Sequence, residues 1–301
     1  MGAGDTGRRV LVIFPGALGD LICFAPALRE LVRRYGDYRV ELMARSELAR
    51  FAVGRLGVAA AHSLDRAEVG GLFVGAVPPA TRQFFGAFAA VHSFFAAGDP
   101  GFRAALSAVA REAHFYPFRP PGEGHMAEAY LGLVGGGMDA EPGVVLLAED
   151  RAAASAVVTR MGGREPGLLL LPGSGSRAKN WPVENFIALA EMFAARDPLA
   201  VLGPAEEDLG PRLRESRVAV VRGLELGTVA ALAARVGVFV GNDSGVSHLA
   251  AAAGARGVVL FGPTDPARWR PRGAVRVMRR EPLAALTPAE VAAAVGGGAE
   301  G

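Results

Sequence analysis

Short apolar runs alternate with helix-like segments along the whole chain, and this alternation limits the possible folds more than any other feature. Apolar runs that are typical of strands cover residues 8–15, 40–45, 72–75 and 89–95. A second series covers residues 167–173, 199–203, 218–223, 238–243 and 257–265. Helix-like segments such as 21–36 and 184–196 separate the runs. Strands that alternate with helices pair in parallel, so the sequence predicts an α/β fold with parallel sheets.

The two series of strands and helices meet near residues 145–165. A chain of 301 residues, 51% of them apolar, can bury two cores of medium size. We therefore expect two Rossmann-like domains, residues 1–160 and 161–301, with parallel sheets that face a central cleft. Ligands of open α/β sheets bind beyond the carboxyl ends of the strands, so functional residues are expected in the turns that follow strands.

Composition and charge exclude several classes of protein. The single cysteine, Cys23, excludes an internal disulfide and any multi-cysteine metal site. No run of about 18 apolar residues is free of charges and helix breakers, so we expect no membrane-spanning helix. Arg8 and Arg9 lead directly into a strand-like run, without a signal peptide, and a cytoplasmic location is expected. A net charge of +2 without a basic, aromatic stripe argues against a nucleic-acid partner.

One lysine, Lys179, stands among 32 basic residues, and all the others are arginine. A chain that uses arginine wherever a cation is needed keeps a lysine where a compact, mobile ammonium serves better than a planar guanidinium. Lys179 follows the buried run Leu168–Leu171 and a loop with Gly173 and Gly175, and a helix is expected from about Pro182. Glycines and a cation between a strand and a helix are typical of phosphate sites. The alternative is a solvated surface lysine.

The same loop, GSGSRA (173–178), matches the dinucleotide pattern GxGxxA. Pro182 delays the following helix too long for that tight turn, so we reject a dinucleotide site. Ser174, Ser176 and the loop amides instead offer hydrogen bonds to a ligand, and Lys179 supplies the charge.

Two further turns carry polar residues after strands. Asp20 ends the glycine-lined turn GALGD (16–20), where it can cap the next helix or act as a general base. In VFVGNDSGVSHL (238–249) the strand is expected to break at Gly241, before a helix whose first turn contains Asp243, Ser244 and Gly245. The free amides of such a helix end bind anions. Helical spacing would turn Ser247 and His248 toward the same mouth; a capping aspartate with a buried histidine is the alternative.

Four stretches together resemble the ADP-heptose:lipopolysaccharide heptosyltransferases, glycosyltransferase family 9. They are GDLI…PALREL (19–31), PGSGSRAKNWPVENF (172–186), GPAEED (203–208) and GNDSGVSHLAAAAGARGVVLFGPTDP (241–266), and HMAEAYLGLV (125–134) is also similar to a helix of the family. The resemblance implies a GT-B fold and an inverting, metal-independent sugar transfer without a cofactor. It implies a nucleotide-sugar donor in the C-terminal half and an acceptor in the N-terminal half.

The resemblance also implies roles for single residues. Asp20 becomes the base that takes the acceptor proton. Lys179 stabilises the leaving diphosphate, with help from Ser174, Gly175 and Ser176 and from the amides of Ser244 and Gly245. Asp243 and His248 contact the donor sugar and phosphates. Glu206 holds the nucleoside ribose, although Glu207 is close enough to blur the register.

The acceptor half is the less recognisable half, and Ser174 and Gly175 stand where such heptosyltransferases often carry paired threonines. The family implies an anionic glycan or glycolipid acceptor, with peripheral contact at the inner face of the cytoplasmic membrane. Arg103, Arg111 and Arg119 would suit such an acceptor, or they are solvated helix faces. Two other functions stay open: a GT-B epimerase or hydrolase of nucleotide-sugars, and an inactive nucleotide-sugar-binding protein.

Overall fold

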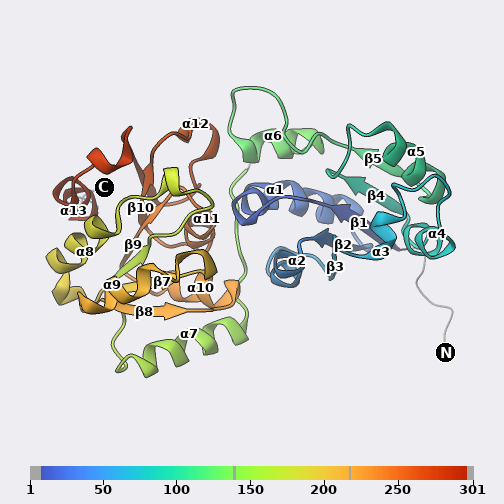
Figure 1. Cartoon of the computed structure of the whole chain (residues 1–301). Coiled ribbons are helices and arrows are strands. Elements are labelled where there is room, and N and C mark those ends of the chain that lie inside the picture. Colours follow the sequence, from blue (N-terminus) through green and yellow to red (C-terminus); the bar gives the residue numbers. More distant parts are fainter. Residues whose placement is uncertain (1–7, 138–139, 217, 297–301) are drawn as a thin grey trace. The chain divides into compact units, whose positions relative to one another are not determined.

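The computed structural model describes residues 8–137, 140–216 and 218–296. The chain divides into two compact units, unit 1 from Met1 to Ala140 and unit 2 from Glu141 to Gly301 (Figure 1). The division thus falls earlier than the expected boundary after residue 160. The reason is helix α7 (Ala148–Arg160), which packs against helix α10 (Leu226–Ala233) of unit 2.

Unit 1 contains a five-stranded, fully parallel sheet with the strand order β3-β2-β1-β4-β5. Its strands are β1 (Arg9–Ile13), β2 (Arg39–Ala44), β3 (Ala60–Ser63), β4 (Ala90–Ser93) and β5 (Ala113–Phe115). Its helices are α1 (Leu18–Tyr35), α2 (Ser46–Ala52), α3 (Ala67–Gly70), α4 (Pro79–Gly86), α5 (Pro100–Val109) and α6 (Met126–Leu133). The order reverses between β1 and β4, which makes the end of β1 the topological switch point of this sheet.

One strand predicted for unit 1 is wrong. Residues 72–75 form a loop after α3, in which Phe73 and Val74 are each 50% exposed. The edge position of the sheet is taken instead by β3, whose sequence AAHS is only partly buried. A short, partly polar edge strand lacks the continuous apolar run by which a buried strand is recognised in a sequence.

Unit 2 contains a six-stranded, fully parallel sheet with the strand order β11-β10-β9-β6-β7-β8. Its strands are β6 (Leu168–Leu171), β7 (Leu199–Leu202), β8 (Ala219–Arg222), β9 (Val238–Asn242), β10 (Gly257–Phe261) and β11 (Val275–Arg279). Its further helices are α8 (Val183–Met192), α9 (Leu209–Glu215), α11 (Gly245–Ala252), α12 (Pro266–Trp269) and α13 (Pro288–Gly296). Short 3₁₀ turns cover Arg177–Lys179, Ala194–Arg196, Pro204–Glu206 and Leu283–Ala285. Here the order reverses between β6 and β9.

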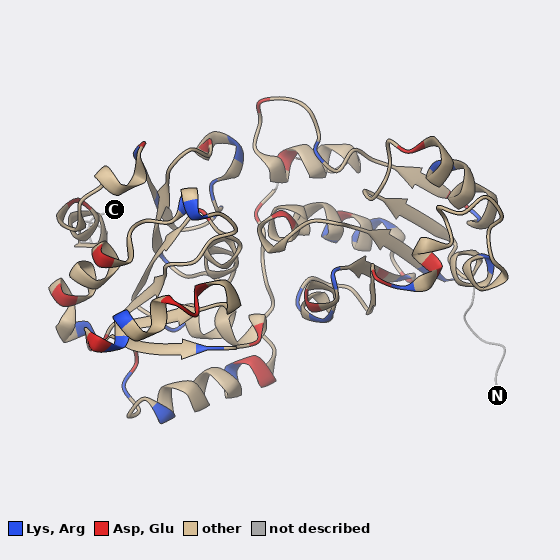
Figure 2. Ribbon diagram, in the orientation of Figure 1, with Lys and Arg blue, Asp and Glu red and all other residues tan. Residues whose placement is uncertain are grey.

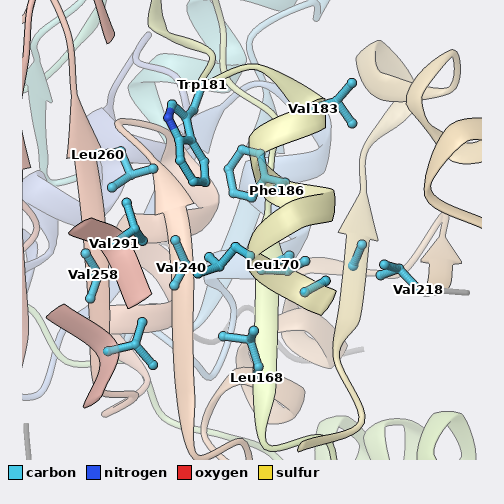
Figure 3. Packing of buried hydrophobic residues seen from close by; sticks show 14 of the residues in the cluster. Leu168, Leu170, Trp181, Val183, Phe186, Val218, Val240, Val258, Leu260 and Val291 are labelled. Carbon is cyan, nitrogen blue, oxygen red and sulfur yellow. The ribbon is translucent and has the colours of Figure 1, made fainter. Parts of the chain in front are cut away.

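One part of the core of unit 2 is formed by aliphatic strand residues under α8 and α13. Leu168, Leu170 and Val240 from the central strands pack beside Trp181 and Phe186, which are fully buried (Figure 3). The Trp181 and Phe186 rings meet edge to face with centroids 5.0 Å apart. The indole Nε1 of Trp181 donates to the carbonyl of Leu286 at 2.8 Å, so this large side chain is buried without an unpaired donor.

Charged residues of both signs are interspersed on the helices and loops of both units, and the strands are largely uncharged (Figure 2). This distribution fits sheets that are covered on both faces by helices. Among the described residues, no helix combines the length and the apolarity that crossing a membrane requires.

Candidate functional site

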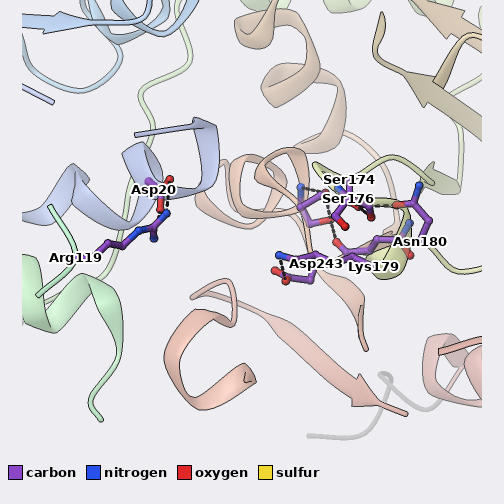
Figure 4. A network of polar contacts seen from close by, with 10 residues as sticks. Asp20, Arg119, Ser174, Ser176, Lys179, Asn180 and Asp243 are labelled. Atoms are coloured by element: carbon purple, nitrogen blue, oxygen red, sulfur yellow. Dashed lines mark hydrogen bonds and ion pairs between the residues drawn. The ribbon is translucent and has the colours of Figure 1, made fainter. Parts of the chain in front are cut away.

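The loop that contains Lys179 follows β6 at the switch point of the unit 2 sheet. Ser174 closes the loop from within: its hydroxyl lies 2.7 Å from the carbonyl of Ser176 and 2.6 Å from Asn180 Oδ1. The same hydroxyl accepts the amide N–H of Ser176 at 3.2 Å. These contacts hold the loop between β6 and α8 in one conformation, and they show Ser174 as an organiser of the loop (Figure 4).

Lys179 is anchored at the end of the neighbouring strand. Its Nζ lies 2.8 Å from Oδ2 of Asp243, which directly follows β9 (Figure 4). The Asp243 side chain is only 6% exposed and that of Lys179 is 33% exposed. The alternative of a freely solvated surface lysine is therefore wrong, because the ammonium is held against a buried carboxylate.

The sequence does not predict a role for Asn242, the last residue of β9. Its side chain is completely buried. The amide Nδ2 donates to the carbonyl of Pro172 at 2.6 Å, and Oδ1 accepts the N–H of Trp181 at 3.0 Å. The one hint in the sequence is a polar amide at the end of the apolar run 238–241.

Helix α11 begins immediately after Asp243, with Ser244 as its N-cap. The Ser244 hydroxyl accepts the N–H of Ser247, at 3.4 Å. The anion site expected at the start of this helix stays a prediction. Asp243, Ser244 and His248 are all nearly buried.

Two expectations about this segment are wrong. Strand β9 continues through Gly241 instead of breaking there. Ser247 does not face the same mouth as Asp243, because it is fully buried and donates to the carbonyl of Asn242 at 2.7 Å. A Cβ on Gly241 would lie 2.4 Å from the Ser247 hydroxyl, so Gly241 is the residue that lets α11 pack this closely on β9.

A pocket of about 380 Å³ opens beside the Lys179 loop. Its lining includes Ser174, Gly175, Ser176 and Glu206. Glu206 is nearly buried, whereas its neighbour Glu207 is exposed. Burial raises the pKa of Glu206, in spite of the N–H that Gly203 donates to it at 3.0 Å. A Cβ on Gly173 would lie 2.4 Å from the Glu206 carboxyl carbon, so the first glycine of the loop makes room for this side chain.

Asp20 lies in unit 1, at the switch point after β1. Helix α1 begins at Leu18, earlier than expected, and Asp20 is therefore in its first turn. Its Oδ2 accepts the N–H of Ala17 at 3.0 Å, which is the capping contact that the sequence offered as an alternative. Its Oδ1 also pairs with Nη1 of Arg119 at 2.8 Å (Figure 4). Arg119 is not on a helix: it lies between β5 and α6 with its side chain 53% exposed, and its guanidinium is 4.6 Å from the Phe118 ring centre.

Comparisons with known proteins identify the family. The sequence model of glycosyltransferase family 9 (heptosyltransferase) matches residues 116–285, which is more than half of the chain. The chain belongs to glycosyltransferase family 9. This family 9 chain is 32% identical to lipooligosaccharide heptosyltransferase 2 of Haemophilus influenzae over 119 residues. That alignment covers 36% of this chain and 34% of the relative's length.

Solved structures show the same fold over nearly the whole family 9 chain. A family 9 glycosyltransferase from Veillonella parvula superposes with a TM-score of 0.77 at 20% identity, covering 95% of this chain and 96% of that one. The heptosyltransferase WaaC of E. coli, solved with ADP, gives 0.72 at 21% identity over 97% of this chain and 100% of the other. The predicted fold class, GT-B with two Rossmann-like units, is confirmed.

Proposed function

We propose that this chain transfers a heptose-like sugar from an ADP-sugar donor to a glycan or glycolipid acceptor of the cell envelope, with inversion and without a metal ion. The observation that carries the proposal is the ion-paired Lys179 at the switch point of the unit 2 sheet. It stands beside the free amides of α11 and the pocket that contains Glu206. Family membership, a heptosyltransferase among the relatives and a similar structure solved with ADP support the sugar class and the adenine nucleotide.

In this proposal unit 2 holds the donor. The diphosphate lies at the amino end of α11, where it meets the amides of Ser244 and Gly245 and the ammonium of Lys179. Glu206 takes the ribose hydroxyls, because its carboxyl lines the same pocket as Ser174, Gly175 and Ser176. Asp243 and His248 contact the sugar and the phosphates.

Unit 1 holds the acceptor, and Asp20 is the base. As the acceptor oxygen bonds to the anomeric carbon, the bond from that carbon to the diphosphate oxygen breaks and ADP leaves with the electron pair. The hydroxyl proton passes to the Asp20 carboxylate, which Arg119 and the Ala17 amide hold in place. Lys179 and the helix amides stabilise the charge that develops on the leaving group, so the mechanism requires no metal ion.

The acceptor class also implies a location. A lipid-linked, anionic acceptor would bring this enzyme to the inner face of the cytoplasmic membrane as a peripheral protein of the cytoplasm. Exposed arginines of unit 1, among them Arg103 and Arg111, are available to such an acceptor.

Calorimetric titration with ADP, UDP, GDP and NAD in metal-free buffer tests the donor part of the proposal. We expect ADP to bind best, and to bind more weakly to the Lys179→Ala variant. A preference for UDP or GDP would mean that the donor sugar carries that nucleotide instead of ADP. The absence of any nucleotide binding by folded protein would refute the proposal. Release of ADP that depends on added acceptor separates transfer from hydrolysis, epimerisation or simple binding.

The Asp20→Asn variant tests the base. We expect loss of transfer by about 10²–10⁴-fold, with ADP-sugar affinity within a few-fold of the wild type. An equal loss of transfer and donor affinity would show that Asp20 is not the base. Activity that disappears in EDTA and returns with Mg²⁺ would contradict the metal-independent mechanism.

A further inference from the structure

The loop that carries Lys179 is fixed at both of its ends by one buried side chain. Pro172 precedes the loop and Trp181 follows it, and both form a main-chain hydrogen bond to Asn242 on β9. Between these two points, Asp243, the residue that directly follows β9, binds the Lys179 ammonium. The loop is therefore held at its start, its end and its functional side chain by two consecutive residues, the last of β9 and the one after it.

The amide group of Asn242 is matched to these two partners. The Pro172 carbonyl only accepts a hydrogen bond and the Trp181 N–H only donates one, so an amide can serve both and neither a carboxylate nor a hydrocarbon can. The group has no contact with solvent, which makes an unpaired partner costly.

The two hydrogen bonds of Asn242, to Pro172 and to Trp181, form the Asn242 clamp, and other contacts make this clamp rigid. Trp181 is pinned by its indole bond to Leu286, and the Asn242 carbonyl accepts the Ser247 hydroxyl of α11. Within the loop, Ser174 is tied to Ser176 and Asn180. The start of α11, the end of β9 and the lysine loop thus form one hydrogen-bonded unit.

We infer that Asn242 is a positioning residue for Lys179: it sets the place of the ammonium relative to the amides of α11 before any ligand binds. A cation that is already in place spends little free energy on ordering when the anion arrives. This inference rests on the proposed role of Lys179 at the diphosphate, and it concerns a residue that touches neither donor nor acceptor.

A double-mutant cycle on ADP affinity tests the inference. The variants are Asn242→Asp, which keeps the shape but as a carboxylate cannot donate to Pro172, Lys179→Ala, and both together, each titrated with ADP by calorimetry at a pH where the carboxyl is ionised. We expect Asn242→Asp to weaken ADP binding about tenfold or more in the presence of Lys179. In the Lys179→Ala background we expect the same change to cost less than about twofold, because the two residues act through one contact.

The outcomes distinguish this inference from the proposed function. If Lys179→Ala leaves ADP affinity unchanged, the diphosphate role itself fails. If Lys179→Ala weakens ADP but Asn242→Asp does not, or if the two losses simply add, Asn242 does not act through Lys179. Asn242→Ser, which introduces no buried charge, serves if the aspartate variant does not fold.

Thr228→Val is the matched control, because Thr228 is a buried polar residue of unit 2 on α10, outside the loop. It should leave ADP affinity unchanged. A loss of affinity in this variant equal to that of Asn242→Asp would reduce the effect of Asn242 to general destabilisation of the unit.

Discussion

The two units bury their ionisable side chains in different places. In unit 1 two of them stand on strands in the middle of the sheet: Glu41 on β2 and His92 on β4. In unit 2 the core cluster under α8 and α13 consists of apolar residues, and the buried Glu206 and Asp243 follow the ends of strands. Among the described residues, buried ionisable side chains thus stand inside the sheet in unit 1 alone, whereas the candidate-site carboxylates, Asp20 of unit 1 included, follow the ends of strands.

The polar network around Glu41 is an ion pair extended by a histidine. Arg9 binds the carboxylate through two bonds of 2.8 Å, and His62 Nε2 lies 2.7 Å from it. Burial alone would raise the pKa of Glu41, but the hydrogen bonds from Arg9 and His62 outweigh it and lower the pKa to about 2. The carboxylate therefore stays charged in the folded protein until the pH falls toward 2.

His92 is buried in the neutral form. Its Nε2 lies 2.7 Å from the Tyr35 hydroxyl and its Nδ1 lies 3.0 Å from that of Tyr116, with the His114 ring stacked against it. Burial, followed by the charges of His114 and Arg34, lowers the pKa of His92 to about 3. A histidine that resists protonation in the folded state favours unfolding as the pH falls below its ordinary value.

The largest predicted effect is acid destabilisation of unit 1. Between about pH 6.5 and 3 the unfolded chain binds a proton at His92 and the folded chain does not, which removes up to about 5 kcal/mol. All four tyrosines lie in unit 1 and both tryptophans in unit 2, so the two signals separate the units. We expect the tyrosine signal to change at a higher pH than the tryptophan signal. Coincident transitions, or the same profile in His92→Gln, would show that buried His92 does not destabilise unit 1 in acid.

The second effect concerns unit 2 and its ligand. Lys179→Ala should cost about 2–4 kcal/mol of transition-state stabilisation, as expected for one lost electrostatic group. Lys179→Arg should also be defective, because a planar guanidinium does not replace a compact ammonium. Steady-state kinetics measure both, and the tyrosine signal of unit 1 should not change. Wild-type rates for Lys179→Arg would show that a guanidinium serves as well as an ammonium at this position.

A third prediction concerns Glu41. Its lowered pKa provides stability that is complete above the ordinary glutamate value and is lost as the pH falls toward 2, in total about 3 kcal/mol. The free energies of unfolding of wild type and Glu41→Gln, measured in urea between pH 6 and 3, should therefore converge as the pH falls. Parallel curves would mean that the Glu41 charge contributes nothing.

The smallest effect is expected for a matched pair of glycine variants in the Lys179 loop. Gly173→Ala should destabilise unit 2 by about 1–3 kcal/mol, because its Cβ would overlap the Glu206 carboxyl group. Gly175→Ala should change stability by less than about 0.5 kcal/mol, since no described atom lies within 4 Å of its Cβ. Thermal unfolding followed by tryptophan fluorescence compares the two. Equal costs would show that Glu206 moves freely away from Gly173.

Features that depend on neighbouring residues can be predicted from the sequence of this protein, and features that depend on residues far apart in the chain cannot. The apolar strands 168–171 and 257–261 and the polar turns after β1, β6 and β9 are local signals, and from these the fold class is correctly predicted. The edge strand β3 and the assignment of α7 to unit 2 depend on partners far along the chain. The pairs Lys179–Asp243 and Asp20–Arg119 join residues 64 and 99 positions apart, so no local pattern announces them. The same holds for the Asn242 clamp, which is formed with two main-chain groups.

The lone lysine has a practical consequence for chemical modification. Nζ of Lys179 is the single side-chain amine of the chain, and a third of that side chain is reachable from solvent. An amine-reactive label can therefore attach only here or at the α-amino group of the chain. Because Asp243 holds the ammonium, labelling will be slow in the resting protein and should stop when a ligand covers the loop. A simple mass measurement of modified protein then reports occupancy of the proposed site, without a substrate or an assay for activity.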